Sequence, residues 1–280
     1  MKRISAVLAA LTLVLAPQAR AEAPESVKAV VAEFGESGEL ISSADVALAK
    51  SLLTKGSAEV AAPTANAVVS PTVGILESRT GQCTASTISS THKVLIVTAA
   101  HCVHDGEGGT WQQPIYFTPG FQVGRPAPHG RFQAKAAVTF DRWVTKSDYN
   151  FDVAFVALRP NDAGAAVGEL VGMNGLIVNA GYVVDRTIVS YEDNVLSQCS
   201  GTTIQSMGFP LEDHLWMIGC PSPPHEGDSG SPWFAEYDGR GGYVNGVISK
   251  GSGVLPHVST PRFDDDVLSI WEGFKDHPGT

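Results

Sequence analysis

Short runs of β-branched and aromatic residues recur along most of this chain, and clusters of Gly, Pro, Asn and Asp separate them. Such runs are typical of strands bounded by turns. The strands that this pattern predicts lie at 93–98, 153–158, 182–189, 215–218 and 243–249. We therefore expect a β-rich body that occupies residues from about 73 onwards.

Helical spacing of apolar residues is strongest near the C-terminus. Val267, Ile270, Trp271 and Phe274 form a stripe, and the three aspartates at 264–266 can cap the helix and complement its dipole. This pattern predicts a C-terminal helix at about 264–276. The alternative use of the three adjacent acids is a calcium site.

The first 21 residues have the pattern of a signal peptide. Lys2 and Arg3 precede an uncharged apolar run at 4–16, and small residues flank the expected cleavage point at 19–21. The apolar run is too short to cross a bilayer as a helix. We expect export to the extracellular space or the periplasm, with a membrane anchor as the alternative.

Residues 22–66 differ in composition from the body. They are rich in Ala, Glu and Ser, carry seven acids against three bases, and end in a linker-like stretch at 61–66. The apolar positions recur at helical spacing, which predicts two short helices; these positions are Val27, Val30, Val31, Phe34, Leu48 and Leu52. We expect a propeptide and linker here, with an N-terminal extension that stays attached as the alternative.

Composition narrows the function classes. The chain has 280 residues, 29 of them Gly and 17 Pro, which favours a turn-rich β protein over a helical bundle. Its formal net charge of −10 argues against a nucleic-acid partner, because phosphate binding depends on Lys and Arg. Nothing after the leader is apolar enough to add a membrane span.

Chemistry-bearing residues occur in motifs at three places. TAAHC at 98–102 ends a predicted strand, DVAFVAL at 152–158 has an acid at the head of another, and GDSGSP at 227–232 places a serine in a glycine-flanked turn. Any one of them has an ordinary structural interpretation, such as a core histidine or a strand-capping aspartate. Together they provide His101, Asp152 and Ser229.

These residue types suit nucleophilic acyl transfer. A serine hydroxyl needs a base within hydrogen-bonding reach, and histidine has a pKa near working pH. A carboxylate orients the histidine and stabilises its charged form. The developing oxyanion needs backbone donors, and Gly227 lets its own N–H and that of Ser229 converge.

The motifs and their order resemble those of the chymotrypsin-fold, trypsin-like serine endopeptidases, over about residues 73–275. The resemblance implies that His101 is the general base, Asp152 its orienting acid and Ser229 the nucleophile. It also implies an oxyanion hole built by the N–H groups of Gly227 and Ser229. Other candidates for the roles of base and acid, which lack the motif settings, are His92, His104, Asp141 and Asp148.

A metal site at His101, Cys102 and His104 is a further alternative, but the paired spacings of metal motifs are absent. Four cysteines in an exported chain suggest two disulfides with three possible pairings, free thiols being the alternative. The resemblance favours Cys83–Cys102, beside the base, and Cys199–Cys220, before the nucleophile turn.

In much of this family the acid before the nucleophile is buried and pairs with a new N-terminal ammonium group. Asp228 matches that position, so the resemblance implies a zymogen, although some bacterial relatives use an internal arginine instead. The candidate positions for the new terminus are Val60, Val68, Val69 and Val73.

Substrate preference departs from the trypsin pattern. The residue six before Ser229 is Pro223 rather than an acid, which disfavours cleavage after Arg or Lys. Ser249, Lys250 and Gly251 match the family's substrate-pairing strand, with Lys250 where an aromatic is common. Lys250, with His225, could favour an acidic substrate residue, as in the bacterial glutamyl endopeptidases; the alternative is that Lys250 points to solvent.

The expected fold is all-β, with two antiparallel six-stranded barrels and a C-terminal helix. The expected organisation is a signal peptide at 1–21, a propeptide and linker at 22–66, and a protease domain at 67–280, with barrels at about 73–165 and 166–262. We expect a monomeric secreted endopeptidase of bacterial type that acts on proteins or peptides without a cofactor, metal, membrane or nucleic acid. A catalytically silent homologue that binds a partner, and a hydrolase of esters only, are the competing functions.

Overall fold

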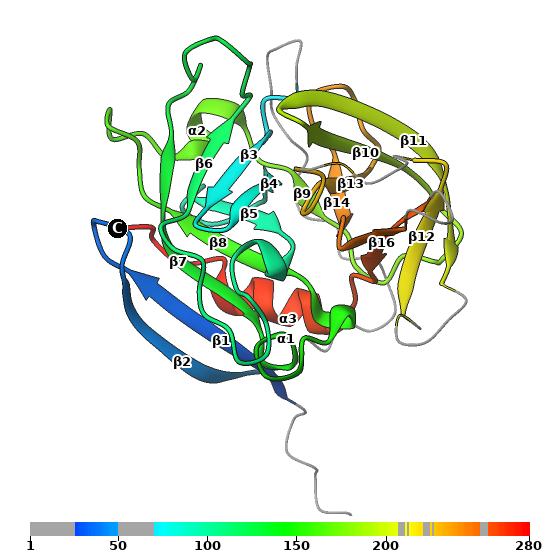
Figure 1. The fold of residues 1–280 in the computed structure, drawn as a ribbon, viewed down its shortest axis with the longest axis horizontal. Coiled ribbons are helices and arrows are strands. Elements are labelled where there is room, and N and C mark those ends of the chain that lie inside the picture. The colour runs from blue at the N-terminus through cyan, green and yellow to red at the C-terminus, as the bar shows by residue number, and fades with distance from the viewer. Residues whose placement is uncertain are drawn as a thin grey trace, which may run out of the picture.

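The computed structural model describes residues 26–49, 70–206, 211, 213–220, 225, 227–252 and 257–280. The expected signal peptide, the linker at 61–66 and Pro223 lie outside these residues. Two β-sheets stand side by side, and a C-terminal helix packs against the first of them (Figure 1). No helix in the described parts of the chain has the length and apolarity needed to cross a membrane.

The first sheet contains a closed antiparallel ring. Its strands follow the order β7-β6-β3-β4-β5-β8, and β8 pairs back with β7. The six strands are β3 (Val73–Ser78), β4 (Gly81–Thr87), β5 (Leu95–Thr98), β6 (Tyr116–Pro119), β7 (Phe132–Phe140) and β8 (Ala154–Leu158). Every residue of β5 and β8 is buried, which explains why these two strands are continuous apolar runs in the sequence.

The second sheet has the order β15-β16-β12-β11-β10-β13-β14-β9. Its strands are β9 (Gly175–Leu176), β10 (Asp185–Glu192), β11 (Val195–Gln205), β12 (His214–Ile218), β13 (Pro232–Ala235), β14 (Tyr243–Val247), β15 (Lys250–Ser252) and β16 (His257–Pro261). β14 pairs with β13, and the next strand in the chain, β15, pairs with β16. The segment from β14 to β15 therefore joins the two sides of this sheet. The architecture is that of the chymotrypsin fold.

The N-terminal segment corrects one prediction. Residues 26–49 form a hairpin of β1 (Ser26–Phe34) and β2 (Leu40–Ala49), where the apolar spacing predicted helices. β1 pairs in antiparallel fashion with β7 and extends the first sheet (Figure 1). The spacing of Val27, Val30 and Phe34 fits a helix, but the β-branched side chains also suit a strand, and pairing with β7 decides between the two.

The C-terminal helix was predicted correctly. α3 (Asp265–Phe274) begins after Asp264, whose side chain accepts hydrogen bonds from the N–H groups of Asp266 and Val267 at 2.9 and 3.2 Å. Asp264 therefore acts as the N-cap. Two short helices, α1 (Asp141–Lys146) and α2 (Val167–Val171), were not predicted, because five or six residues are too few to show a helical period.

Both disulfides have the pairing that the family resemblance implied. Cys83 in β4 is bonded to Cys102, and Cys199 in β11 is bonded to Cys220. Cys102 follows His101 directly, so the first bridge ties the histidine segment to β4.

Replacing Cys83 and Cys102 together by alanine should destabilise the protein by about 3 kcal/mol, because the bridge closes a loop across 19 positions of the sequence and restricts the unfolded chain. Urea unfolding of the Ser229→Ala protein, with and without the two cysteine substitutions, measures this loss. An unchanged unfolding midpoint would contradict the expectation.

Candidate active site

His101 lies directly after the end of β5, in the single 3-10 turn η1 (Ala100–Cys102). β5 is fully buried, so the turn that follows it has a fixed position on the barrel. The imidazole is partly exposed, with 26% of its side-chain surface accessible, whereas the flanking Ala100 and Cys102 are buried. The histidine is therefore held rigidly by its neighbours while its ring reaches the surface.

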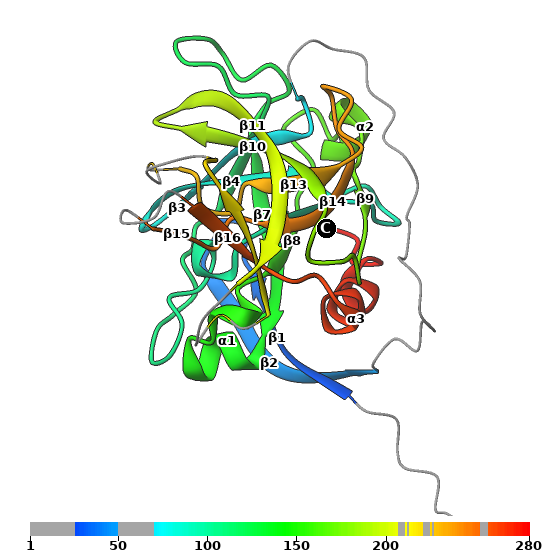
Figure 2. The same cartoon turned by 90° about the vertical axis from the view of Figure 1, so that its right-hand side faces the viewer.

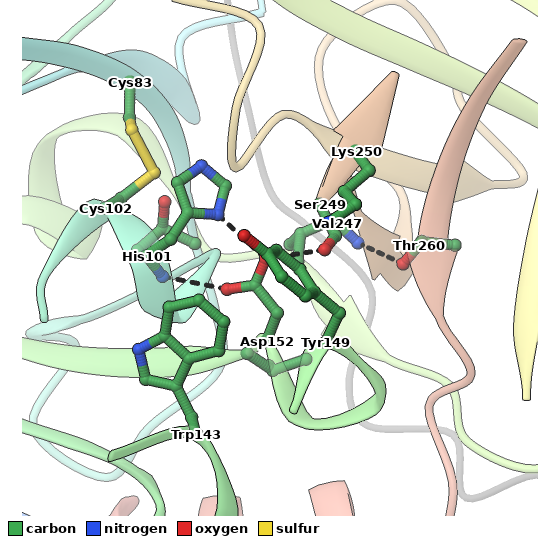
Figure 3. Close-up of polar contacts among 12 residues, drawn as sticks. Cys83, His101, Cys102, Trp143, Tyr149, Asp152, Val247, Ser249, Lys250 and Thr260 are labelled. Atoms are coloured by element: carbon green, nitrogen blue, oxygen red, sulfur yellow. Dashed lines mark hydrogen bonds and ion pairs between the residues drawn. A yellow bond between two sulfur atoms is a disulfide. The ribbon is translucent and has the colours of Figure 1, made fainter. Parts of the chain in front are cut away.

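Asp152 is completely buried and contacts His101 twice. One carboxylate oxygen accepts a hydrogen bond from the His101 backbone N–H at 2.8 Å, and the other lies 2.8 Å from Nδ1 of the ring (Figure 3). The Ser249 hydroxyl donates to the second oxygen at 2.6 Å. These contacts hold the imidazole with Nδ1 towards the carboxylate, which leaves Nε2 as the nitrogen able to take up a proton.

The charges of this pair stabilise each other. Burial alone would raise the Asp152 pKa, but the charge of His101 and the hydrogen bonds from His101 and Ser249 outweigh it and lower that pKa. Burial alone would lower the His101 pKa, but the Asp152 carboxylate raises it above its usual value. The charge of Lys250 acts against this rise. Asp152 therefore stays ionised, and His101 is a stronger base than a free histidine.

Ser229 lies in the 227–230 turn just before β13, and its residue is partly exposed. The turn is fastened to β4: the Thr84 N–H donates to the Ser229 carbonyl, and the Thr84 hydroxyl donates to the Gly227 carbonyl, both at 2.8 Å. Thr98, at the end of β5, donates to the Thr84 carbonyl at 2.9 Å. The segments that carry His101 and Ser229 thus share β4 as a common anchor.

The two glycines of this turn are required by the close approach of other backbone. Gly227 has φ +96°, and a Cβ there would lie 2.2 Å from the Tyr191 carbonyl oxygen. Gly230 has φ +78°, and a Cβ there would lie 2.3 Å from the Thr84 carbonyl oxygen. A side chain at either position would push the turn away from β4.

Some backbone N–H groups of the turn form hydrogen bonds with other described residues, and others do not. Those of Asp228, Gly230 and Ser231 donate to carbonyl oxygens, whereas those of Gly227 and Ser229 donate to no other described residue. Asp228 itself is buried, and its Oδ2 accepts from the His225 N–H at 2.7 Å. Its Oδ1 has no partner among the described residues.

The environment of Asp228 is unfavourable to a charge. Burial, with smaller contributions from Glu192 and Asp193, raises the pKa of Asp228 to about 6. No arginine in the described part of the chain pairs with Asp228. The buried Arg186 donates instead to the Asn245 side chain at 2.7 Å and to the Asp185 carbonyl. A partner for Asp228 is thus still required in the charged state.

Lys250 does not point freely to solvent. Its Nζ lies 3.3 Å from the centre of the Tyr149 ring, and its surface is partly buried (Figure 3). Burial lowers its pKa, and the Asp152 carboxylate opposes this. Gly251 is exposed beside it, and β15, which carries both residues, pairs only with β16. The ammonium group therefore lies beside the His101–Asp152 pair, over an aromatic face.

The sequence analysis did not name Trp143 and His214 near this pair, and it assigned Ser249 to substrate binding only. The role of Ser249 as a donor to Asp152 could not be seen, because 97 positions separate them. Trp143 packs with its ring centre 6.4 Å from that of His101 and donates to the His104 carbonyl. His214 on β12 is buried, lies with Nε2 2.9 Å from the Tyr149 carbonyl, and has its pKa lowered by burial to about 4, so it is neutral and donates there.

The rejected candidates have other roles. His104 is buried, accepts from the Gly106 N–H, and packs edge-on against Trp111. Asp148 caps the turn η2 (Tyr149–Phe151) by accepting from the Asn150 N–H, and Asp141 opens α1. Cys83, His101 and Cys102 lie close enough to hold a metal, but the two sulfurs are bonded to each other and are not available as ligands.

Residues 80–242 match the family described as "Trypsin-like peptidase domain". Sequence comparison with curated proteins gives no match.

Solved structures with the same fold include three proteases. The protease Anisep from Arthrobacter nicotinovorans has a TM-score of 0.67 at 23% identity, over 75% of this chain and 98% of that one. The thermostable serine protease AL20 from an extremophilic microorganism has 0.65 at 24%, over 74% and 97%. A Glu endopeptidase has 0.60 at 16%, over 77% and 95%.

Replacing Lys250 by methionine should raise the pKa of His101, because a positive charge beside the imidazole disfavours its protonated form. Methionine keeps an apolar contact with Tyr149. The measurement is an NMR titration of the His101 ring in the Ser229→Ala protein. Lys275→Met, which removes a lysine paired with Asp276 on α3's C-terminal side, is the control and should leave the titration unchanged.

Proposed function

The chain belongs to the trypsin-like peptidase domain family, and from that membership we propose that it is a secreted serine endopeptidase that cleaves peptide bonds through an acyl-enzyme. The observation that carries the proposal is the buried Asp152, which is bonded to both the backbone and the ring of His101 and to Ser249. Such a network orients an imidazole for proton transfer.

In the proposed mechanism, His101 Nε2 accepts the Ser229 hydroxyl proton as the serine oxygen attacks the substrate carbonyl. Asp152 stabilises the imidazolium that forms, and the same proton then passes to the leaving amine. Water repeats the sequence to release the acid. His101 must be neutral to act as base, so the rate should rise with pH through its pKa.

The oxyanion would be held by the N–H groups of Gly227 and Ser229. Two features support this: neither group donates to another described residue, and both belong to a turn whose glycines allow close packing on β4. Two preorganised donors at this point stabilise the charge that develops on the carbonyl oxygen.

Substrate binding is assigned to Ser249, Lys250, Gly251 and Pro223. Among the residues that the structure describes, β15 pairs on one side only, so its other edge can accept an extended peptide by strand addition. The ammonium group of Lys250, together with His225, would favour an acidic residue in the substrate. The similar fold of a Glu endopeptidase is compatible with this preference.

We propose further that the chain is made as a zymogen. The unpartnered Oδ1 of the buried Asp228 supports this, because a new N-terminal ammonium group would supply the missing cation. Of the four candidate termini, Val60, Val68 and Val69 lie outside the described residues. Val73 is the buried first residue of β3, and its N–H donates to the Ser70 carbonyl. A cut before Val73 would therefore disrupt the start of this strand.

A fluorophosphonate probe should form one stoichiometric adduct with the secreted protein, and Ser229→Ala should abolish it. Asp152→Asn should lower kcat by roughly 10⁴-fold, since the wrong imidazole tautomer would face the serine. Intact mass spectrometry measures the adduct and also the mature N-terminus, and casein digestion distinguishes a protease from an esterase. No adduct on a processed chain would favour the silent homologue.

Asp228→Asn should stabilise the uncut Ser229→Ala protein at neutral pH by roughly 1–3 kcal/mol. The folded-state pKa of about 6 exceeds the unfolded value of 3.8, so the folded state loses stability as the pH rises between these values. Urea unfolding at pH 4 and pH 7 should show the benefit only at pH 7. Equal effects at both pH values would contradict the raised pKa of Asp228, and destabilisation at pH 7 would show that the carboxylate is already paired.

A further inference from the structure

The 26–49 hairpin completes the hydrogen bonding of a barrel strand. On one edge of β7, β6 pairs only with Phe132 and Gln133, and β1 pairs with the rest of that edge, from 136 to 140. The opposite edge of β7 is occupied by β8. Without β1, the alternate residues of this stretch whose backbone groups face β1 would lose their hydrogen-bond partners.

The hairpin also fills part of the barrel core. Ala29, Ala32 and Phe34 have at most 1% of their surface exposed, and they belong to the same apolar cluster as the barrel strands. On the helix side, Leu48 lies so close to Gly273 of α3 that a Cβ there would be 2.7 Å from its side chain. The hairpin lies before residue 80, where the matched family region begins.

Polar contacts also fasten the hairpin near its turn. Glu33 lies 3.1 Å from Nε2 of His277, beyond the end of α3, and 3.8 Å from the Lys135 ammonium group on β7. The Phe34 carbonyl accepts from the Arg159 guanidinium at 2.8 Å. The hairpin thus contacts β7, the segment after β8 and the C-terminal segment, which lie beside it in Figures 1 and 2.

Trp111 connects the hairpin to the His101 segment. On the hairpin side, the ring packs edge-on against Phe34 at 6.1 Å and its Nε1 donates to the Ser43 hydroxyl at 3.1 Å. On the other side, it packs against His104 at 5.0 Å. The next residue, Gln112, donates from its side chain to the His101 carbonyl at 2.9 Å.

We infer that the hairpin is a permanent part of the working molecule: when the chain is cut between residues 50 and 69, residues 26–49 stay bound and support the His101 segment through Trp111. The segment that composition identifies as a propeptide is then divided. Its first half is a structural strand pair, and only the part after the hairpin serves for cleavage. The support of His101 rests on the proposed protease function, whereas the retention of the hairpin does not.

Retention is tested without any enzymatic activity. A recognition sequence for a site-specific protease is placed within 55–66 of the full-length Ser229→Ala protein, which is then cut and run on a native size-exclusion column. One peak containing both fragment masses is expected, and the fragments should separate only in denaturing urea. Release of the N-terminal fragment under native conditions, whether the body stays soluble or precipitates, overturns the inference.

Support of His101 is tested with neighbouring serines of β2. Ser43→Ala removes the partner of Trp111, whereas Ser42→Ala changes an exposed residue on the other face of the strand. Ser43→Ala should lower the fluorophosphonate labelling rate and kcat by about threefold with an unchanged KM, and Phe34→Ala by about tenfold, because small displacements of a catalytic group are costly. Ser42→Ala should behave like the unaltered protein.

These results separate the two proposals. Equal labelling rates for all three variants would overturn the support of His101. Absence of labelling in the unaltered protein as well would instead overturn the proposed protease function, while the column experiment would still decide whether the hairpin is retained.

Discussion

A carboxylate with no exposed surface, that of Asp152, is the group around which the two sheets are arranged. Removing such a charge from water is costly unless donors surround it. Here the donors come from both sheets: two from His101 at the end of β5, and one from Ser249 between β14 and β15. Satisfying one buried charge therefore fixes the first barrel, the second sheet and the orientation of the imidazole at once.

Strand β4 links the His101 segment to the turn that carries Ser229. Its Thr84 binds the 227–230 turn through backbone and side chain, its Cys83 is bonded to the residue after His101, and its Thr84 carbonyl accepts from Thr98. The segments that carry His101 and Ser229 are thereby attached to neighbouring residues, Cys83 and Thr84, of one strand. Small movements of the second sheet would shift the serine only as far as these hydrogen bonds allow.

Local patterns explain which parts of the fold could be predicted. Strands β5 and β8 are continuous buried runs, and α3 has both a cap and an apolar stripe, so sequence and structure agree there. Helices were wrongly predicted for the 26–49 segment because the spacing of its valines fits both a helix and a strand. Its neighbour on the sheet, β7, lies more than 100 positions away, and no local pattern shows that β6 leaves part of one edge of β7 unpaired.

By itself, the sequence determined the family, through the order of the histidine, aspartate and serine motifs and the glycines beside the serine. The motifs are short and local, because strand ends and tight turns are set by neighbouring residues. Only the tertiary structure decided that Ser249 completes the hydrogen bonding of Asp152 and that the Lys250 ammonium group lies over the Tyr149 ring. It also decided that the N-terminal segment is a strand pair. Each of these depends on contacts between residues far apart in the chain, whose partners become identifiable only when burial and backbone pairing bring them together.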